Sequence, residues 1–284
     1  MNPDRSGIRP RKRFSQNFLR NRNVARLMAE SLGLEQGDVV LEIGPGEGVL
    51  TEWLLGTAAG TVIAVELDER CVQWLEQRFG RDGRLTIMQS DILAVRFESL
   101  PAQGRKIRVI GNIPYHLTSP ILFHVLGQRG FVKDMTVMLQ REVARRLAAP
   151  PGSKEYGIPS VIFQLVSDVR LLFQVPKKSF SPVPKVDSAV VQAVFLDHPR
   201  FPVSDWEFFI RVVRALFNQR RKMLRNTVRP FLPGPDYPAP LPVDLSARPE
   251  DCSVSELVLL ANFLYDQNRD ANRLAEPGDS TWAF

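Results

Sequence analysis

The chain has 284 residues, 44% of them hydrophobic, which is enough for one large domain and one small one. Its mean hydropathy of -0.12 is typical of a soluble protein, and no apolar run approaches the ~18 residues of a membrane span. The N-terminus lacks the apolar core of a secretory signal. Cys71 and Cys252 have no metal-ligand or Cys-x-x-Cys spacing. We therefore expect no metal centre and a reduced, cytoplasmic compartment.

The formal net charge is +6 and the isoelectric point about 9.6, which suggests a polyanionic partner. Much of the positive charge gathers in two clusters near the ends of the chain. Their members are Arg5, Arg9, Arg11, Lys12, Arg13, Arg20, Arg22 and Arg26 in the first, and Arg220, Arg221, Lys222, Arg225 and Arg229 in the second. Solvated surface is the simpler explanation of one basic run, and a basic N-terminus also fits an organelle transit peptide. Two dense clusters in a basic protein favour a cradle for nucleic acid.

Apolar segments bounded by turn residues alternate with helical patterns in the first two thirds of the chain. The expected strands are residues 39–43, 62–65, 85–88, 108–110, 135–139, 169–174 and 189–195. The expected helices are residues 49–55, 69–79 and 120–126. Repeated strand–helix units argue for a parallel sheet covered on both faces. A Pro-rich loop at 176–184 separates the last two strands, so we expect an α/β fold with a seven-stranded sheet and a reversed final strand.

After about Leu196 the pattern becomes helical. Apolar residues from Trp206 to Phe217 recur at helical spacing. Four arginines are expected along another side of the same helix: Arg211, Arg214, Arg221 and Arg225. Six prolines between residues 230 and 242 interrupt regular helix.

A last helix is expected from Ser253, because Ser253 and Glu256 have the spacing of a capping box. The polar tail from about Asn268 is expected to be disordered. These boundaries predict two domains, residues 1–197 for the sheet and 198–284 for a small helical domain with its tail.

Residues 42–48, Glu-Ile-Gly-Pro-Gly-Glu-Gly, stand between an expected strand and an expected helix. Glycines such as Gly44 and Gly46 let the backbone turn tightly and approach a ligand closely, and the helix start behind them offers free N–H groups. A dinucleotide fold is the rival interpretation, but its Gly-x-Gly-x-x-Gly fingerprint needs glycine where Val49 stands. The acidic Glu42 before the loop resembles the class I methyltransferase signature. The loop therefore predicts a Rossmann-like site for S-adenosylmethionine.

Acidic side chains follow the next two expected strands. Glu66 can accept hydrogen bonds from both hydroxyls of a ribose. Asp91 can accept one from the amino group of the cofactor's adenine. Each acid alone fits an ordinary surface or capping residue. Because open α/β sheets bind ligands at the carboxyl ends of their strands, the shared position of both acids predicts cofactor contacts.

Gly-Asn-Ile-Pro-Tyr at residues 111–115 follows the fourth expected strand. The motif alone could be a plain turn, but after the glycine loop and both acids it resembles the motif of methyltransferases that act on a planar amine. The Asn112 oxygen and the main-chain carbonyl of Ile113 or Pro114 can accept the two N–H bonds of that amine. Tyr115 offers a face for base stacking, which contributes ~1–3 kcal/mol.

A second aromatic is needed across the pocket, and Phe180 on the Pro-stiffened loop is the expected one; a buried loop anchor is the alternative. A target base in RNA must be unstacked or flipped to reach such a pocket. No strong general base is required, because the amine becomes acidic once it is methylated. Positioning of donor and acceptor supplies much of the catalysis.

Five motifs together resemble the ribosomal RNA adenine dimethyltransferase family. They are residues 11–19, 42–48, 111–115, 180–188 and 217–222, and the resemblance runs from about residue 9 to about residue 265. It implies transfer of two methyl groups to each of two adjacent adenines near the end of small-subunit ribosomal RNA, in a late-assembly subunit. The implied partners are the small ribosomal subunit and its RNA, without a membrane, and we expect a monomer.

The resemblance also implies roles for individual residues. Gln16, Asn17 and Leu19 would close over the cofactor, and Gly44, Glu66, Asp91 and Asn112 would contact it or the target. Together with Arg11, Lys12 and Arg13, the implied RNA-binding residues are Arg220, Arg221, Lys222 and Arg225.

Two positions depart from the usual family pattern: Ser15 replaces a glycine and Ile113 replaces a leucine. Ile113 and residues 116–119 also resemble the sister group that methylates one adenine of large-subunit RNA and confers macrolide resistance. The longer motifs at 184–188 and 217–222 favour the small-subunit group. A non-catalytic assembly factor is a further alternative. A DNA adenine methylase fits the Asn-x-Pro-Tyr motif, but no recognisable target-recognition domain follows.

Overall fold

The computed structural model describes residues 8–11, 16–232 and 242–270. The chain divides into two compact units, and each unit draws on two segments. The first unit contains residues 1–144 and 169–195, and the second contains residues 145–168 and 196–284. The division expected from the sequence differs from these units in grouping residues 145–168 with the sheet, and it stays a prediction.

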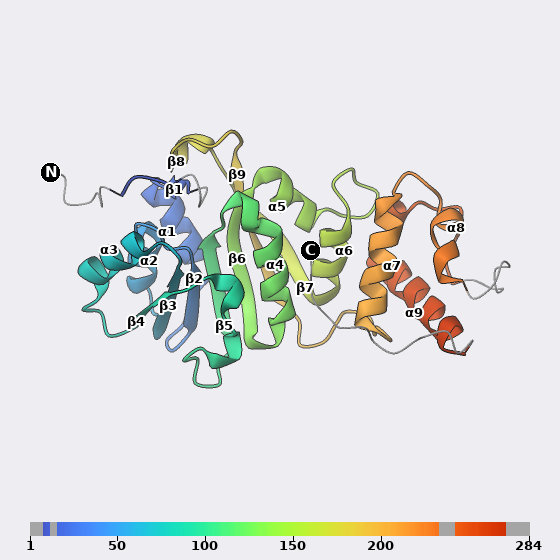
Figure 1. Ribbon diagram of the computed structural model, residues 1–284, viewed down its shortest axis with the longest axis horizontal. Helices are drawn as coiled ribbons and strands as arrows, with labels where there is room; N and C mark the ends of the chain where they lie inside the picture. Colours follow the sequence, from blue (N-terminus) through green and yellow to red (C-terminus); the bar gives the residue numbers. More distant parts are fainter. Residues whose placement is uncertain (1–7, 12–15, 233–241, 271–284) are drawn as a thin grey trace. The chain divides into compact units, whose positions relative to one another are not determined.

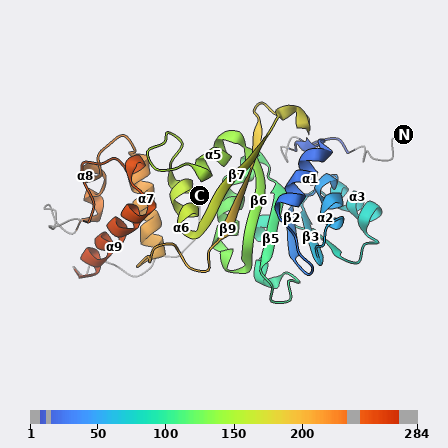
Figure 2. The same cartoon turned by 180° about the vertical axis from the view of Figure 1, so that it is seen from behind.

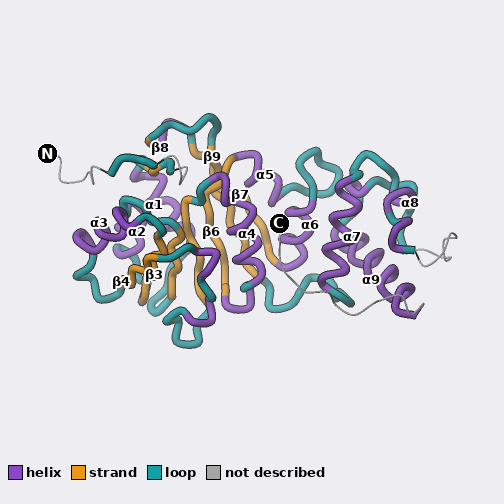
Figure 3. Tube along the Cα trace, in the orientation of Figure 1, coloured by secondary structure: helices purple, strands orange, loops and turns teal. Residues whose placement is uncertain are grey.

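The first unit is built on a seven-stranded sheet (Figures 1 and 3). The strands are β2 (Val39–Ile43), β3 (Thr61–Glu66), β4 (Leu85–Gln89), β5 (Ile107–Asn112), β6 (Val132–Gln140), β7 (Ser167–Val175) and β9 (Ser188–Phe195). Their order is β4-β3-β2-β5-β6-β9-β7. β2, β3, β4, β5 and β6 pair in parallel, and β9 is antiparallel to β6. The predicted seven-stranded sheet with a reversed final strand is confirmed.

Helices cover both faces of this sheet, with α4 on one face and α1 and α2 on the other (Figures 1 and 2). The helices of this part of the chain are α1 (Arg22–Ser31), α2 (Val49–Leu55), α3 (Glu69–Phe79), α4 (Thr118–Gly127) and α5 (Arg141–Ala148). The bounds of α2 and α3 are those predicted. The sequence reading did not identify α1, which starts where the Asn21 side chain accepts the N–H groups of Asn23 and Val24.

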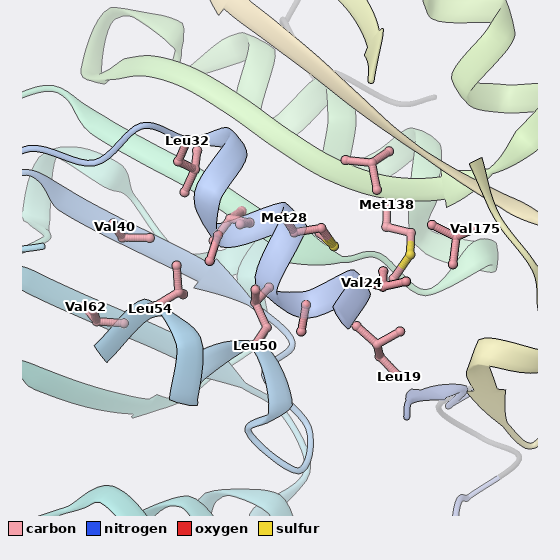
Figure 4. Close-up of a cluster of buried hydrophobic side chains, with 14 of the residues drawn as sticks. Leu19, Val24, Met28, Leu32, Val40, Leu50, Leu54, Val62, Met138 and Val175 are labelled. Atoms are coloured by element: carbon pink, nitrogen blue, oxygen red, sulfur yellow. The ribbon is translucent and has the colours of Figure 1, made fainter. Parts of the chain in front are cut away.

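The core below the site forms where α1 and α2 pack on the sheet (Figure 4). Met28 of α1 and Leu54 of α2 are fully buried, together with Val40 and Val62 of the adjacent strands. Burying a side chain of this size contributes ~1.5–3 kcal/mol. Met138 and Leu19 extend the same cluster toward β6 and the N-terminal segment. This core therefore supports the N-terminal segment, which lines the site.

A two-stranded ribbon joins two segments that are far apart in the sequence. β1 (Phe18–Leu19) pairs antiparallel with β8 (Phe180–Ser181), with Leu19 opposite Phe180. Both strands lie together beyond the edge of the main sheet (Figure 1). The ribbon therefore connects the motif at residues 11–19 to the motif at residues 180–188.

The second unit is helical in its described part. Its helices are α6 (Ile158–Val166), α7 (Trp206–Asn218), α8 (Leu224–Thr227) and α9 (Val254–Asp270). α7 buries Phe209, Val213 and Leu216, and α9 packs against it through its own apolar face. The expected apolar stripe of α7 is thus confirmed as core.

The C-terminal ends of α7 and α9 differ from those expected from the sequence. α7 ends at Asn218, so Arg221 and Arg225 do not share a helix with Arg211, because the chain turns at residues 219–222. α9 continues to Asp270, and the Asn268 amide donates to the Phe231 carbonyl at 2.7 Å; the remainder of the tail expected to be disordered lies outside the described residues.

The capping box is confirmed in full. Ser253 Oγ accepts the Glu256 N–H at 3.2 Å, and the Glu256 carboxylate accepts the Ser253 N–H at 2.8 Å. Among the described residues, no helix is long and apolar enough to cross a membrane. Within that same part of the chain, no group of three or more His, Cys, Asp or Glu could hold a metal ion.

A buried ion pair stabilises the sheet away from the glycine loop. The Arg108 guanidinium donates to Asp134 at 2.5–3.1 Å and to Asp38 at 3.0 Å. The side chains of Arg108 and Asp134 are only 6% and 3% exposed. A buried charge without its partner is costly, because neither water nor protein then solvates it.

We predict that Arg108→Met lowers the free energy of unfolding by about 3–5 kcal/mol, because Asp134 is left buried and unpaired. Urea unfolding measures this change. The exposed pair of Arg26 and Glu30 is the control, and Arg26→Met should cost less than about 1 kcal/mol. Equal losses in the two variants would contradict a special role for the buried pair.

Candidate active site

A cavity of about 380 Å³ opens in the first unit, where β2, β3 and β5 end. Every predicted cofactor-binding or catalytic residue lines it: Gln16, Asn17, Leu19, Gly44, Gly46, Glu66, Asp91, Asn112, Pro114, Tyr115 and Phe180. The sheet register explains their convergence. Ile43 pairs with Val65 on one side and with Gly111 on the other. The next residue of each strand, Gly44, Glu66 and Asn112, therefore reaches the same edge.

Three glycines of the loop, Gly44, Gly46 and Gly48, have positive φ, and the first two differ in their surroundings. Gly44 has φ +63°, and a Cβ there would meet no atom within 4 Å, so the loop faces open space. Gly46 has φ +57°, and a Cβ there would lie 3.0 Å from the Phe18 ring. Residues other than glycine rarely adopt this left-handed backbone conformation. The loop thus forms an open cradle on one side and receives the N-terminal segment on the other.

Glu66 is buried and shapes this cradle. Its carboxylate accepts the Gly46 N–H at 3.0 Å and the Asp68 N–H at 2.8 Å. Burial raises the pKa of Glu66, and the two N–H donors counteract part of that rise. A carboxylate in this position can still accept hydroxyl donors, because each oxygen has a second lone pair.

Asp91 has the capping role that the sequence left open, and its predicted cofactor contact stays a prediction. It follows β4 and caps the short turn of residues 92–94, where its carboxylate accepts the Leu93 N–H at 2.9 Å. The side chain is exposed and also lines the cavity. A capping role and a ligand contact are compatible, because the carboxylate has a second oxygen.

Glu42 lies deeper, below the loop, with an exposed fraction of 1%. Its carboxylate accepts the Thr51 hydroxyl at 2.7 Å. Burial raises the pKa of Glu42 to about 8, with a smaller contribution from the nearby Glu66. At neutral pH this side chain is therefore mostly a neutral acid in the ligand-free protein.

The N-terminal segment closes over the cavity through polar contacts. Gln16 donates to the Asp68 carboxylate at 3.0 Å, and Arg70 donates to the same carboxylate at 2.5–3.2 Å. Burial opposes the charge of Asp68, but these donors hold its pKa down at about 2. Arg20 forms an ion pair with Glu47 of the glycine loop. The segment is thus held by the Asp68 carboxylate and by Glu47 of the glycine loop.

Asn112 stands at the end of β5 with a defined amide orientation. Its Nδ2 donates to the Asn17 carbonyl at 3.0 Å. The Oδ1 atom is the acceptor end of the same amide. The Pro114 carbonyl already accepts the Leu117 N–H at 3.0 Å, which favours the Ile113 carbonyl as the second acceptor for an amine.

Two aromatic side chains, Tyr115 and Phe180, line the cavity. The Tyr115 hydroxyl shares a hydrogen bond of 2.8 Å with Ser188 Oγ, which holds the ring from its far end. Phe180 is 3% exposed and is fixed by the β1–β8 pairing. Phe180 therefore lines the cavity and is held by its backbone, and its ring-stacking role stays a prediction.

The predicted RNA-binding residues differ in their surroundings. Lys12 and Arg13 lie outside the described residues. Arg220 donates to Glu250 at 2.6 Å and to the Lys154 carbonyl at 2.9 Å, so its charge is partly committed within the helical unit. Arg11, Arg221, Lys222 and Arg225 are exposed.

Sequence reasoning missed three residues that support the site. Phe18 packs over Gly46, Asp68 anchors Gln16, and Ser188 holds Tyr115. The motifs at 11–19 and 180–188 contained Phe18 and Ser188 without indicating their partners. Asp68 had one local signal, the Asp-x-Arg spacing of a helix N-cap with a basic neighbour.

The strand order, the glycine cradle and the row of acids and amide at the strand ends define a class I methyltransferase. The family model for ribosomal RNA adenine dimethylase matches residues 7–266. The chain therefore belongs to the ribosomal RNA adenine dimethylase family.

Curated relatives agree with this family. The chain is 43% identical over 256 residues to the ribosomal RNA small subunit methyltransferase A of Pseudomonas aeruginosa. The aligned region covers 90% of this chain and 95% of that protein. It is 41% identical over 261 residues to the protein of the same name from Magnetococcus marinus, covering 91% and 93% of the two chains.

Solved structures show the same fold. A dimethyladenosine transferase from Plasmodium falciparum superposes with a TM-score of 0.73 at 21% identity, covering 90% of this chain and 98% of that one. The 23S rRNA methyltransferase ErmE superposes with a TM-score of 0.67 at 25% identity, covering 88% and 100%. The fold is therefore common to a protein named a dimethyladenosine transferase and one named a 23S rRNA methyltransferase.

We predict that Glu42 gives the ligand-free protein a pH-dependent stability. Its folded pKa of about 8 is above the ordinary value of 4.5, so between these values the native state holds a proton that the unfolded state releases. The free energy of unfolding then falls with rising pH, by up to about 1.4 kcal/mol per pH unit for one proton. Glu42→Gln should reduce this slope between pH 5.5 and 7.5 in urea unfolding, and the raised pKa of Glu66 accounts for a part that remains. The exposed Glu76→Gln should leave it unchanged, and an unaltered slope in Glu42→Gln would refute the assignment.

Proposed function

We propose that this protein uses S-adenosylmethionine to dimethylate the exocyclic amines of two adjacent adenosines near the 3′ end of small-subunit ribosomal RNA, and that it acts late in subunit biogenesis. The observation that carries the proposal is Asn112, which lies between a glycine cradle and two aromatic side chains in one cavity. The 43% identity to a small subunit methyltransferase supports the choice of RNA.

The residues of the cradle fit S-adenosylmethionine. Open space at Gly44 admits the close approach of a ligand, Glu66 can accept ribose hydroxyls, and Asp91 can accept an amino group. Gln16, Asn17 and Leu19 would cover the group from the N-terminal side. When bound, S-adenosylmethionine supplies a methyl group on a positively charged sulfur.

Asn112 would orient the amine of the target. Its Nδ2 is occupied by the Asn17 carbonyl, so Oδ1 can accept one N–H of the adenine, and the Ile113 carbonyl can accept the other. The lone pair of an aromatic amine is delocalised into the ring, and two acceptors favour the pyramidal nitrogen that exposes it. This positioning is the main catalytic contribution of the protein.

Tyr115 and Phe180 would hold the flipped adenine by stacking, which replaces part of the stacking lost in RNA. Ser188 keeps the Tyr115 ring in place. The methylated amine can lose its proton to water, so no strong base is needed at this side of the cavity.

The large-subunit alternative rests on a specific observation, the fold similarity to ErmE. Its 25% identity is much lower than the 41–43% identity to the small subunit methyltransferases. The small ribosomal subunit is therefore the proposed partner, with the protein acting as a cytoplasmic monomer. Four basic side chains that are exposed in the described part of the chain are proposed to contact RNA: Arg11, Arg221, Lys222 and Arg225.

We predict that the parent protein forms dimethyladenosine in undermethylated small subunits and that Asn112→Ala lowers this rate by at least about 100-fold, a loss typical of one preorganised hydrogen bond. Mass spectrometry of the RNA measures the product on small and large subunits in parallel. Asn112→Ala should still bind S-adenosylmethionine and the small subunit. Transfer by the parent to large-subunit RNA alone would overturn the proposal, and full activity of Asn112→Ala would overturn the role of that residue.

We predict a different response for neighbouring cations of the helical unit. Among the described residues neither Arg221 nor Lys222 has an ion-pair partner, whereas Arg220 is paired with Glu250. Arg221→Gln with Lys222→Gln should reduce the slope of log Kd against log salt by about one unit per lost phosphate contact, with unchanged thermal stability. Arg220→Gln should lower thermal stability. An unchanged slope in the double variant would assign Arg221 and Lys222 to ordinary solvated surface.

A further inference from the structure

Three lysines surround Phe180 on the loop of residues 176–187. Lys177, Lys178 and Lys185 are all exposed. Within the described parts of the chain, none of them has an ion-pair partner. The family motifs and the proposed RNA-binding clusters leave the two lysines before Phe180 without a role.

Asp187, the one acidic residue of this loop, already has partners within the protein. Asp187 Oδ1 accepts the main-chain N–H of Lys177 at 3.0 Å, which closes the loop on itself. The Asp187 carboxylate also lies 3.5 Å from Arg141, and its carbonyl accepts the Arg141 N–H at 3.0 Å. Asp187 therefore shapes the loop, and the three ammonium groups remain available to an external anion.

The loop is also fixed relative to the cavity. The Ser179 carbonyl accepts the N–H groups of Arg20 and Asn21 at 2.7 and 3.2 Å, and Phe180 pairs with Leu19. Phe180 itself lines the cavity. The lysines on both sides of Phe180 are therefore held beside the cavity by hydrogen bonds at the loop ends and in its middle.

The loop also exposes apolar surface. Val183 is 58% exposed and Val186 is 45% exposed, on either side of Lys185. Surfaces that combine unpaired cations with apolar side chains suit single-stranded nucleic acid, because the cations contact phosphates while apolar groups contact sugars and unstacked bases. A flipped nucleotide leaves its flanking phosphates outside the pocket, beside the pocket entrance.

We infer that residues 176–187 form a phosphate-binding surface for the RNA strand on both sides of the target adenosine, with Lys177, Lys178 and Lys185 as its contacts. This inference rests on the proposed function, because it takes the adenine pocket as given. The surface holds the strand while Phe180 and Tyr115 hold the base. It therefore contributes to binding of the substrate, and the transfer step depends on Asn112.

The test compares two triple variants that remove equal charge. Lys177→Gln, Lys178→Gln and Lys185→Gln are combined in the first. The control combines Arg81→Gln, Lys133→Gln and Arg170→Gln, which are exposed in the same unit and do not line the cavity. Undermethylated small subunits are the substrate, and KM, kcat and the salt dependence of Kd are measured for both.

The loop variant should raise KM about tenfold at 0.15 M salt with kcat within about twofold of the parent. Its slope of log Kd against log salt should be smaller by about two units, since each lost phosphate contact removes ~0.7–0.9. The control should keep the KM of the parent. Equal KM and slope in the two triple variants would overturn the inference.

The activity of the parent protein distinguishes failure of the proposed function from failure of the phosphate-binding surface. If it transfers no methyl group to small subunits, the proposed function fails whatever the variants do. If it is active and the loop variant has a parental KM and slope, only the phosphate-binding surface is refuted. A loop variant that loses kcat with unchanged KM would also contradict it, because that result assigns the loop to the transfer step.

Discussion

The parallel register of β2 with its two neighbours is the constraint on which the site depends. Ile43 lies opposite both Val65 and Gly111, and the chain leaves each strand at the following residue. A shift of one residue in either pairing would turn the next side chain to the other face of the sheet. The shared edge therefore requires the hydrophobic core below it, which α1 and α2 complete. Chemistry at the strand ends is a consequence of packing in the strand interiors.

The N-terminal segment connects the two halves of the cavity. Phe18 covers the glycine loop, the Asn17 carbonyl orients Asn112, and Leu19 pairs with Phe180. Consecutive residues thus contact the glycine loop, the Asn112 amide and the strand that contains Phe180. The segment is itself held by Asp68 and Glu47.

Charge is distributed unevenly around the cavity. Near the glycine loop, the cavity is lined by four acids, Glu42, Glu47, Glu66 and Asp91, whereas Asn112, Tyr115 and Phe180 line it with neutral groups. Asp68 lies outside this lining, where it holds Gln16. Burial raises the pKa of Glu42 and Glu66, while the donors of Gln16 and Arg70 lower that of Asp68. Carboxyl oxygens can accept the hydroxyl and amino hydrogens of the proposed methyl donor, and neutral acceptors suit an amine that needs orientation more than deprotonation. The cations lie outside, on surfaces that can meet phosphates.

The sequence by itself determined the class of fold and the residues that line the cavity, because alternating strands and helices, glycines and strand-end polar residues are local patterns. It identified the helices at 49–55 and 69–79, but it did not identify α1, whose amphipathic pattern lies within a strongly basic segment. Only the tertiary structure decided that β1 pairs with β8, that Asn112 donates to Asn17, and that Ser188 holds Tyr115. It also separated Arg221 and Arg225 from α7. These features join distant segments, and a hydrogen bond between them leaves no periodic trace in the sequence of either partner.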